Sequence, residues 1–416
     1  MPMNLRNRLF LLLFFVSAFA KADESETSLG FKYNTNTVAI EDTTTWTGKM
    51  QQRLDSLINL PLFETTQLGL YVYDLTADRD LACVNHRQRM RPASNQKVVT
   101  AVSALHYLGS DYRFKTQMYL TGEITTDSIL EGDICFVGYM DPILSRGEVY
   151  QMALALSKAG IDSIAGVIYL DLSFKDTKEW GWGWCWDDDL IPLHPLLVEK
   201  KDRFVSEILQ DLSSVGIQGA SIDRVVQLPC PPSARLFCEA THTMEQVLDR
   251  MMKKSDNYYA ESMFYQLAAR NGRKHASRKD AASCINQLIR EVGLSPSSYQ
   301  IADGSGLSLY NYVSPELLVR LLRYAWNNES IRSYLYPSLP IAGVDGTLEK
   351  RMRKTAAEGN IHAKTGTVDG ISSLSGYATS PEGHVLVFAI INQGVTKASV
   401  GRDFQDKVCE LLCKEN

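Results

Sequence analysis

Ser94 and Lys97 stand three residues apart at the start of an apolar segment with helical spacing. At spacing i, i+3 on a helix the two side chains share one face, so the amine can reach the hydroxyl. A serine hydroxyl alone is a poor nucleophile, but a lysine that has lost its proton can act as its base. Burial and a second cation, here Lys364, would favour the neutral amine. The pair predicts nucleophilic acyl transfer, whereas the same string alone is more often a helix cap followed by a solvated lysine.

A second string, Ser255-Asp256-Asn257, comes directly before another helical pattern. In that position Ser255 can relay a proton between Lys97 and a leaving nitrogen, and the amide of Asn257 can hold Lys97 and bind a substrate carbonyl. The alternative is a simple helix cap, for which Ser and Asp are favoured residues. We expect Asp256 to be structural rather than catalytic.

A third string, Lys364-Thr365-Gly366-Thr367, lies in a strand-like segment. The glycine permits close approach of a substrate backbone laid along the strand. Lys364 and the hydroxyls of Thr365 and Thr367 would grip a terminal carboxylate, and the backbone N–H groups of Thr367 and Ser94 could form an oxyanion hole. The alternative is an ordinary strand end. Period-two alternation places His362 on the same face as Lys364, where we expect a packing residue.

The elements that must position these strings follow from periodicity. Residues 244–267 and 315–326 have helical spacing. At the two ends of the chain, the patterns predict one antiparallel sheet covered by terminal helices. Its expected helices are 44–60, a segment from Ser94 to Gly109, and 403–414, and its expected strands are 67–74, 80–85, 361–368, 371–379 and 384–392.

Between these parts the pattern changes to short β-like runs separated by Gly and Asp turns, at 114–120, 129–137 and 164–172. We therefore expect an inserted β-rich domain inside the domain that bears the three strings. The predicted division is a signal peptide at 1–20, a serine acyl-transferase domain at 21–109 and 236–416, and an inserted domain at 110–235.

The first twenty residues are typical of a secretory signal peptide, with Arg6 and Arg8, an apolar run from Leu9 to Phe15, and a small-x-small cleavage site ending at Ala20. The apolar run is too short to cross a bilayer, which takes about 20 residues. We expect a soluble exported enzyme, located in the periplasm. Removing two arginines and no acid takes the formal net charge from −5 to about −7, so binding to nucleic acid is not expected.

Eight cysteines in an oxidising compartment make disulfides possible, but nothing in the sequence fixes their pairing. Cys230 and Cys238 flank a Pro-Pro-Ser turn and are the best candidate pair, although buried free thiols are at least as well supported. Histidines at zinc-finger spacing and an HExxH string are both lacking. We therefore expect no metal and no other cofactor.

The three strings, in this order, make the chain resemble the D-alanyl-D-alanine carboxypeptidase/endopeptidase family, the low-molecular-mass class C penicillin-binding proteins. The resemblance covers most of the chain after the signal peptide. It departs from the family at Tyr139-Met140, where small residues are usual, and at Cys185, where proline is common. Its insert is also shorter than the insert of longer family members. Further segments similar to the family are Gly138-Tyr139-Met140-Asp141-Pro142, Asp303-Gly304-Ser305-Gly306-Leu307-Ser308 before Val313-Ser314-Pro315, and Trp184-Cys185-Trp186-Asp187-Asp188.

The resemblance implies a penicillin-recognising serine transpeptidase-like fold of the α/β (α+β) class, with an antiparallel sheet, a helical cluster and a β-rich insert. It implies a serine-type D-Ala-D-Ala carboxypeptidase, a D,D-endopeptidase or both, acting on peptidoglycan stem peptides through an acyl-enzyme. β-Lactams would be covalent inhibitors, and a homodimer is one of the oligomeric states left open. Asp188 would contact the amine of a diamino acid in the stem peptide, with Asp187 as the rival. The alternating tryptophans from Trp180 to Trp186 could stack on a sugar or form a packing stripe.

Two other functions compete with this one. A serine β-lactamase uses the same three strings, but we see no glutamate placed to position a deacylating water, and the large insert favours a polymeric substrate. A non-catalytic peptidoglycan-binding scaffold is the third alternative. The presence of Ser94, Lys97, Asn257 and Lys364 counts against a decayed site.

Overall fold

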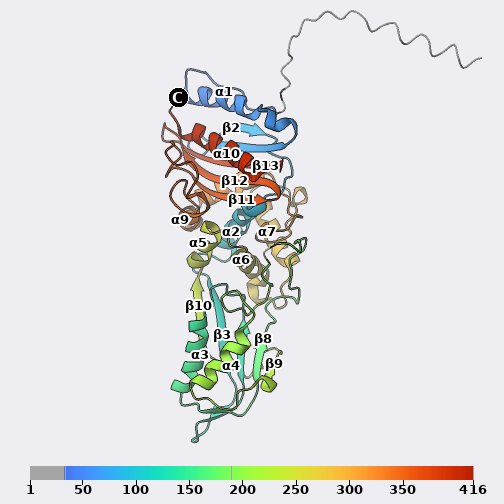
Figure 1. Ribbon diagram of the computed structural model, residues 1–416, viewed down its shortest axis with the longest axis vertical. Coiled ribbons are helices and arrows are strands. Elements are labelled where there is room, and N and C mark those ends of the chain that lie inside the picture. Colours follow the sequence, from blue (N-terminus) through green and yellow to red (C-terminus); the bar gives the residue numbers. More distant parts are fainter. Residues whose placement is uncertain (1–31, 33, 189, 416) are drawn as a thin grey trace, which may run out of the picture. The chain divides into compact units, whose positions relative to one another are not determined.

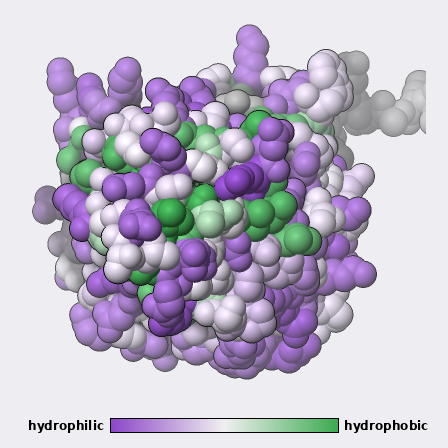
Figure 2. All heavy atoms as spheres, turned by 90° about the horizontal axis from the view of Figure 1, so that it is seen from below, coloured by the Kyte–Doolittle hydropathy of each residue, from purple (hydrophilic) through white to green (hydrophobic). Residues whose placement is uncertain are grey.

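The computed structural model describes residues 32, 34–188 and 190–415. The predicted signal peptide lies outside the described residues. All described helices and strands belong to one compact unit, Asn34–Asn416. Within the described part of the chain, no helix combines the length and hydropathy needed to span a bilayer. Figure 2 shows hydrophobic side chains in small groups among hydrophilic ones on the face seen from below.

The first sheet has five strands in the order β11-β12-β13-β1-β2. Every neighbouring pair is antiparallel, which confirms the predicted antiparallel sheet. The sheet joins the two ends of the chain, because β1 from the N-terminal part pairs with β13 from the C-terminal part. The strands are β1 (Gln67–Asp74), β2 (Arg79–Val84), β11 (His362–Val368), β12 (Gly370–Thr379) and β13 (Val385–Val395).

Both faces of this sheet are buried, each in its own core. Alternate residues of β13 show the division, since Phe388 joins one core and Val387 joins the other. The core of Phe388 contains residues of α1 (Trp46–Ile58) and α10 (Ala398–Cys413), which lie beside the sheet in Figure 1. The core of Val387 contains the helical cluster, so the sheet is a layer between helices.

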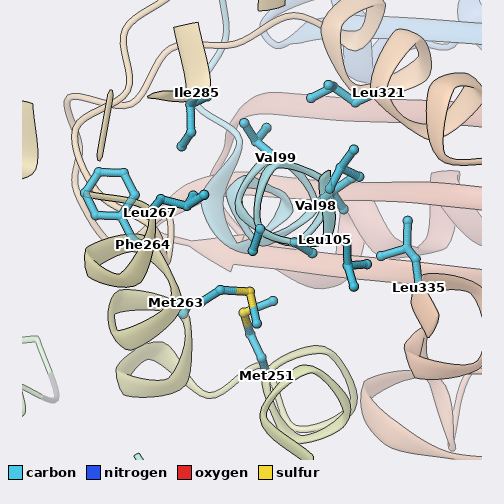
Figure 3. Packing of buried hydrophobic residues seen from close by; sticks show 14 of the residues in the cluster. Val98, Val99, Leu105, Met251, Met263, Phe264, Leu267, Ile285, Leu321 and Leu335 are labelled. Atoms are coloured by element: carbon cyan, nitrogen blue, oxygen red, sulfur yellow. The ribbon is translucent and has the colours of Figure 1, made fainter. Parts of the chain in front are cut away.

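Helix α2 (Gln96–Tyr107) runs through the middle of the helical cluster. Its residues from Gln96 to Leu105 are all buried, which explains why apolar side chains occur around its whole circumference. Figure 3 shows Val98, Val99 and Leu105 of α2 surrounded by Met251, Met263, Phe264, Leu267, Ile285, Leu321 and Leu335. The surrounding helices are α5 (Met244–Lys253), α6 (Asn257–Ala269), α7 (Arg278–Glu291), α8 (Pro315–Asn327) and α9 (Glu329–Ser338).

The second sheet has the strand order β10-β3-β6-β8-β9 and packs one face against two helices. The predicted β-rich domain had no helix assigned to it, and the structure adds α3 (Arg146–Lys158) and α4 (Phe204–Ser214). The expected strands 129–137 and 164–172 are each divided in two, because turns containing Gly132 and Gly166 interrupt them. The strands are β3 (Arg113–Leu120), β6 (Ile134–Gly138), β8 (Ile168–Asp171), β9 (Val225–Val226) and β10 (Arg235–Thr243), with a small sheet of β4 (Glu123–Ile124), β5 (Ile129–Glu131) and β7 (Ser163–Ile164).

The second sheet bears on the predicted domain division. Strand β10 pairs with β3 from Arg235 to Thr243, so a boundary between residues 235 and 236 would cut a strand. The core beneath this sheet consists of residues from Met118 to Ala240. We propose that the inserted domain continues to Thr243 and that the other domain resumes with α5.

All eight cysteines are free thiols. The candidate disulfide between Cys230 and Cys238 is therefore not formed. The side chain of Cys230 instead lies near that of Cys135 on strand β6. This contact joins residues far apart in the chain, and no local pattern predicts it.

Candidate active site

Ser94 lies in a single 3-10 turn, Ala93–Asn95, directly before α2. Ala93 has φ of 47°, in the left-handed region that residues with a Cβ rarely adopt. A side chain on Gly306 would place its Cβ 1.8 Å from the Ala93 carbonyl oxygen, so only glycine fits there. The surrounding structure thus holds the serine-bearing turn in a strained conformation, a feature that concentrates at functional sites.

The same turn is fixed to the first sheet by side chains of β12. Asn95 Nδ2 donates to Ser373 Oγ at 2.6 Å, and Ser373 Oγ donates to the Pro92 carbonyl at 2.6 Å. Ser375 Oγ donates to the amide oxygen of Asn95. These bonds set the position of the serine relative to β11, the strand that carries the Lys364 string.

Gly366 lies where β11 passes closest to the serine. A Cβ at this position would lie 2.3 Å from Ser373 Oγ, 2.8 Å from the Pro92 carbonyl oxygen and 3.0 Å from the Ser94 amide nitrogen. The strand can approach the backbone of the serine only because position 366 has no side chain.

Lys97 Nζ has three hydrogen-bond partners. They are Ser94 Oγ at 2.9 Å, Asn257 Oδ1 at 2.7 Å and the Ser305 carbonyl at 2.8 Å. A neutral amine has two N–H groups and one lone pair. The two carbonyl oxygens can take both hydrogens, which leaves the lone pair for the hydroxyl of Ser94. When the amine gains a proton, the serine oxygen can accept the third N–H.

Lys97 is completely buried. Burial lowers the pKa of Lys97 to about 8, although three carboxylates near it act in the opposite direction. Burial disfavours the ammonium form because a charge loses its hydration in a medium of low dielectric constant. The sequence interpretation assigned this effect partly to a charge on Lys364. In the structure the shift at Lys97 comes from burial.

Lys364 is also completely buried, and its Nζ lies 2.9 Å from Ser255 Oγ and 2.7 Å from the Thr365 carbonyl. Burial, together with the charge of Lys97, holds the pKa of Lys364 well below its ordinary value. Two ammonium groups in one buried site repel each other, so the free protein does not keep both protonated. Ser255 has φ of 57°, a second strained residue in the site.

The remaining residues of the second and third strings occupy the edge of the site. Asp256 Oδ2 accepts from Lys200 at 2.7 Å and from Arg250 at 3.1 Å, so its carboxylate is paired outside the catalytic cluster. Thr367 is exposed. Thr365 Oγ1 and Thr347 Oγ1 are hydrogen-bonded at 2.7 Å.

His362 packs rather than reaching the reacting groups. Its ring stacks on Tyr336 with centroids 4.2 Å apart and an interplanar angle of 15°.

Sequence reasoning missed Glu261, which lies beneath Lys97. Its carboxyl accepts hydrogen bonds from the backbone N–H groups of Gly304 at 3.1 Å and Ser305 at 2.8 Å. These bonds fix the backbone of Ser305, whose carbonyl accepts a hydrogen bond from Lys97. Burial raises the pKa of Glu261 to about 8. One signal could have found it, because Glu261 follows Asn257 by four residues on α6 and therefore shares its helix face.

Asp303 fixes the other side of the loop that contains Gly304 and Ser305. Its carboxylate accepts Gly306 N at 2.8 Å and the indole N–H of Trp184 at 2.9 Å. The tryptophan segment is therefore a turn docked on this loop, and the four indoles do not line one face of an extended strand. Trp180, Trp182 and Trp186 are exposed, in contrast to Trp184.

Asp188, the predicted contact for a substrate amine, follows this turn. Its Oδ2 accepts the backbone N–H of Cys185 at 2.7 Å. Asp187, the rival, is exposed. Asp188 remains a prediction for substrate binding.

The Gly138–Pro142 segment supports α6 from the inserted region. Ser262 Oγ donates to the carbonyl of Met140. Asp141 Oδ2 lies 2.7 Å from His242 Nδ1, while Glu148 Oε1 lies 3.1 Å from His242 Nε2. Burial disfavours the charged imidazole, but hydrogen bonds to the two carboxylates outweigh it and raise the pKa of His242 to about 9.

In residues 32, 34–188 and 190–415, no three His, Cys, Asp or Glu side chains gather as metal ligands would.

Comparison with known proteins gives one family. The model of the D-Ala-D-Ala carboxypeptidase 3 (S13) family matches residues 50–197 and 195–415. D-alanyl-D-alanine carboxypeptidase DacB of Haemophilus influenzae is 25% identical over 411 residues, which cover 78% of this chain and 85% of the relative. D-alanyl-D-alanine carboxypeptidase of Actinomadura sp. is 26% identical over 446 residues, which cover 83% of this chain and 81% of the relative.

A solved structure gives the fold. The crystal structure of penicillin binding protein 4 from Haemophilus influenzae superposes with a TM-score of 0.78 at 24% identity, and covers 89% of this chain and 99% of that chain. The similarity confirms the predicted penicillin-binding fold.

Proposed function

The chain belongs to the D-Ala-D-Ala carboxypeptidase 3 (S13) family, and we propose that Ser94 is the nucleophile with which it opens D-alanyl bonds of peptidoglycan stem peptides. As a member of this family, the chain is a serine-type D-Ala-D-Ala carboxypeptidase. The observation that carries the assignment to Ser94 is the hydrogen-bonding of Lys97, whose two carbonyl partners leave one position of the amine for the serine hydroxyl.

In the acylation step, neutral Lys97 takes the proton of Ser94 Oγ as the oxygen attacks the carbonyl of the D-Ala bond. The developing oxyanion accepts hydrogen bonds from the backbone N–H groups of Ser94 and Thr367. Gly366 supports this assignment, because the lack of a side chain lets β11 lie against the Ser94 amide nitrogen.

The leaving nitrogen then needs a proton. We assign to Ser255 the relay of the proton that Lys97 took from Ser94 to the leaving nitrogen. Two contacts support this role: Ser255 Oγ lies 2.9 Å from Lys364 Nζ, and Asn257, two residues further on, binds Lys97. A substrate carboxylate arriving at Lys364 would favour the ammonium form of that lysine. Lys364 therefore gains its charge, and its grip on the substrate, when the substrate binds. Water releases the acyl group in the second half of the reaction.

A labelling experiment tests the assignment. Purified protein is incubated with a fluorescent penicillin, and the adduct is located by peptide mass analysis and followed over time. A long-lived adduct on Ser94 is the expected result. Rapid loss of the adduct would favour a β-lactamase, and no adduct at all would favour a non-catalytic scaffold. Ser94→Ala should abolish labelling, whereas Ser103→Ala on the same helix, a buried serine bonded to the Val99 carbonyl, should retain it.

Digestion of muropeptides separates the two peptidase activities that the site can perform. Pentapeptide monomers that lose their terminal D-Ala indicate carboxypeptidase action, while crosslinked dimers converted to monomers indicate endopeptidase action. Mass analysis of the products distinguishes them. If neither substrate is cleaved although the penicillin adduct forms, the proposed natural substrate is wrong.

Peptidoglycan lies outside the cytoplasm, and so we infer that the chain works there after removal of the predicted signal peptide near Ala20. Cell fractionation with an antibody against the protein tests this, together with the N-terminal sequence of the recovered chain. Recovery in the cytoplasm with an intact Met1 would contradict it.

A further inference from the structure

A cavity lies at the end of α6 opposite to the catalytic strings. The helix begins at Asn257, whose amide holds Lys97, and ends at Ala269, which lines the cavity. The first and last of its 13 residues are twelve steps of 1.5 Å apart, so the two ends are separated by about 18 Å. The cavity has a volume of about 490 Å³, within the range of small-molecule sites.

One wall of the cavity is a face of the second sheet. Side chains alternate along a strand, so Lys115 and Tyr119 of β3 share one face while Met118 belongs to the other. Met118 is part of the core under α3 and α4. Lys115 and Tyr119 line the cavity together with Asp171 of β8. The sheet thus has one apolar face in a core and one polar, aromatic face along the cavity.

The cations of this cavity outnumber its acids. Lys115, Arg270, Arg273 and Lys274 line it, against the single carboxylate of Asp171.

That carboxylate is already engaged by the protein. Asp171 accepts the backbone N–H groups of Ser173 and Cys230, each at 2.9 Å. Burial opposes its ionisation, but these hydrogen bonds outweigh burial and lower the pKa of Asp171. The Asp171 carboxylate thus holds the loop around Cys230 against the sheet. Lys274 is close enough to act on it as a charge, but the two do not form an ion pair.

The cations differ in their own partners. Arg273 pairs with Asp280 at 3.1 Å, and Arg270 lies over the ring of Tyr107 with its carbon 4.4 Å from the centroid. Lys115 lies 5.0 Å from the ring centroid of Tyr139, which is a cation–π contact and does not neutralise the amine. An anion in the cavity would therefore meet a lysine that no carboxylate has already paired.

We propose that this cavity is a binding site for a small organic anion. A carboxylate or phosphate group would lie against Lys115 and Lys274. The ring or apolar body of the ligand would lie against Tyr119 and Tyr139, whose rings offer a large contact area with hydroxyls at the edge. The site is separate from Ser94, so it would hold a second ligand, or a second part of a polymer, while the serine is occupied.

Calorimetric titration of the full chain tests this. The serine is first blocked with penicillin, so that an anion entering the catalytic cleft is not counted. N-acetylmuramic acid serves as the carboxylate probe, glucose 6-phosphate as the phosphate probe, and N-acetylglucosamine as the neutral control. We expect at least one anionic probe to bind about 10-fold or more tightly than the neutral sugar, and the tighter of the two identifies the acid group. Equal affinities, or no binding, would overturn the proposal.

Substitutions of the two lysines test where the anion binds, and they do so even if penicillin does not block the serine. Replacing Lys115 and Lys274 together by methionine should weaken binding of the anionic probe by about 10-fold or more. Lys158→Met is the matched control, because Lys158 is an exposed lysine of α3 on the other side of the sheet, and it should bind as the parent does. A thermal unfolding midpoint close to that of the parent shows that the double variant is folded. A folded double variant with undiminished affinity would place the anion elsewhere.

Discussion

Acylation of Ser94 should accelerate strongly with pH, because its base is an amine with a pKa of about 8. Only the neutral form of Lys97 can take the proton. The neutral fraction is about one tenth at pH 7 and about nine tenths at pH 9, so the rate of adduct formation should rise about 10-fold between these values. A lysine at the ordinary value of 10.5 would be neutral in only about 0.03% of molecules at pH 7, and its rate would still rise about 100-fold over the same interval.

The assay is the second-order rate constant for labelling by fluorescent penicillin between pH 6 and 10, at constant ionic strength. The expected curve is a single rise with a midpoint near 8. A curve that rises steadily to pH 10 would show that burial does not lower the pKa of Lys97, and a flat curve would show that a different group is the base. The first result would refute the lowered pKa of Lys97, and the second would refute its assignment as the base.

Arginine at position 97 is the control, since a guanidinium keeps its proton throughout this range. Lys97→Arg should lose labelling at every pH, and should not regain it at pH 10. Thermal unfolding of this variant checks that the loss is not caused by a disrupted helix.

Three further predictions concern other parts of the structure. Glu261→Gln should move the midpoint of the acylation curve to lower pH, because Glu261 begins to ionise near pH 8 and its ionised form raises the pKa of Lys97; an unchanged midpoint would contradict this. Gly366→Ala should slow penicillin labelling about 100-fold, since a Cβ there would force β11 away from the Ser94 turn; labelling at the normal rate would show that the strand can yield. The raised pKa of His242 stabilises the fold fully below pH 6.5, and this contribution, about 3 kcal/mol, should be lost as pH rises through about 9. Urea unfolding of the parent and of His242→Asn measures this contribution as the difference between their unfolding free energies, which should shrink as pH rises through about 9; a difference that stays constant would contradict it.

Much of the fold could be predicted because the first sheet has clear local patterns. The strand expected at 67–74 coincides with β1, and the three late strands agree with β11, β12 and β13 within three residues. Two helices of the inserted region were not predicted. Of these, α3 has a capping box formed by Ser145 and Glu148 that could have been recognised, whereas Arg203, the residue before α4, provides no side-chain cap.

The candidate site divides in a similar way. Ser94 and Lys97 could be found because residue type and helical spacing suffice to place them on one face. The partners that make Lys97 a base could not, since Ser305 is more than two hundred residues away and acts through its backbone carbonyl, which any residue possesses. The depressed pKa depends on complete burial, which follows from how helices pack and not from any one segment.

The contact between Gly306 and the carbonyl of Ala93 limits how this enzyme could evolve under an antibiotic. A methyl group at position 306 would overlap the oxygen atom of the residue next to the nucleophile. A substitution at position 306 is therefore not available to the enzyme as a route of escape from the drug. Escape is then left to positions without such a contact, such as the exposed side chain of Thr367.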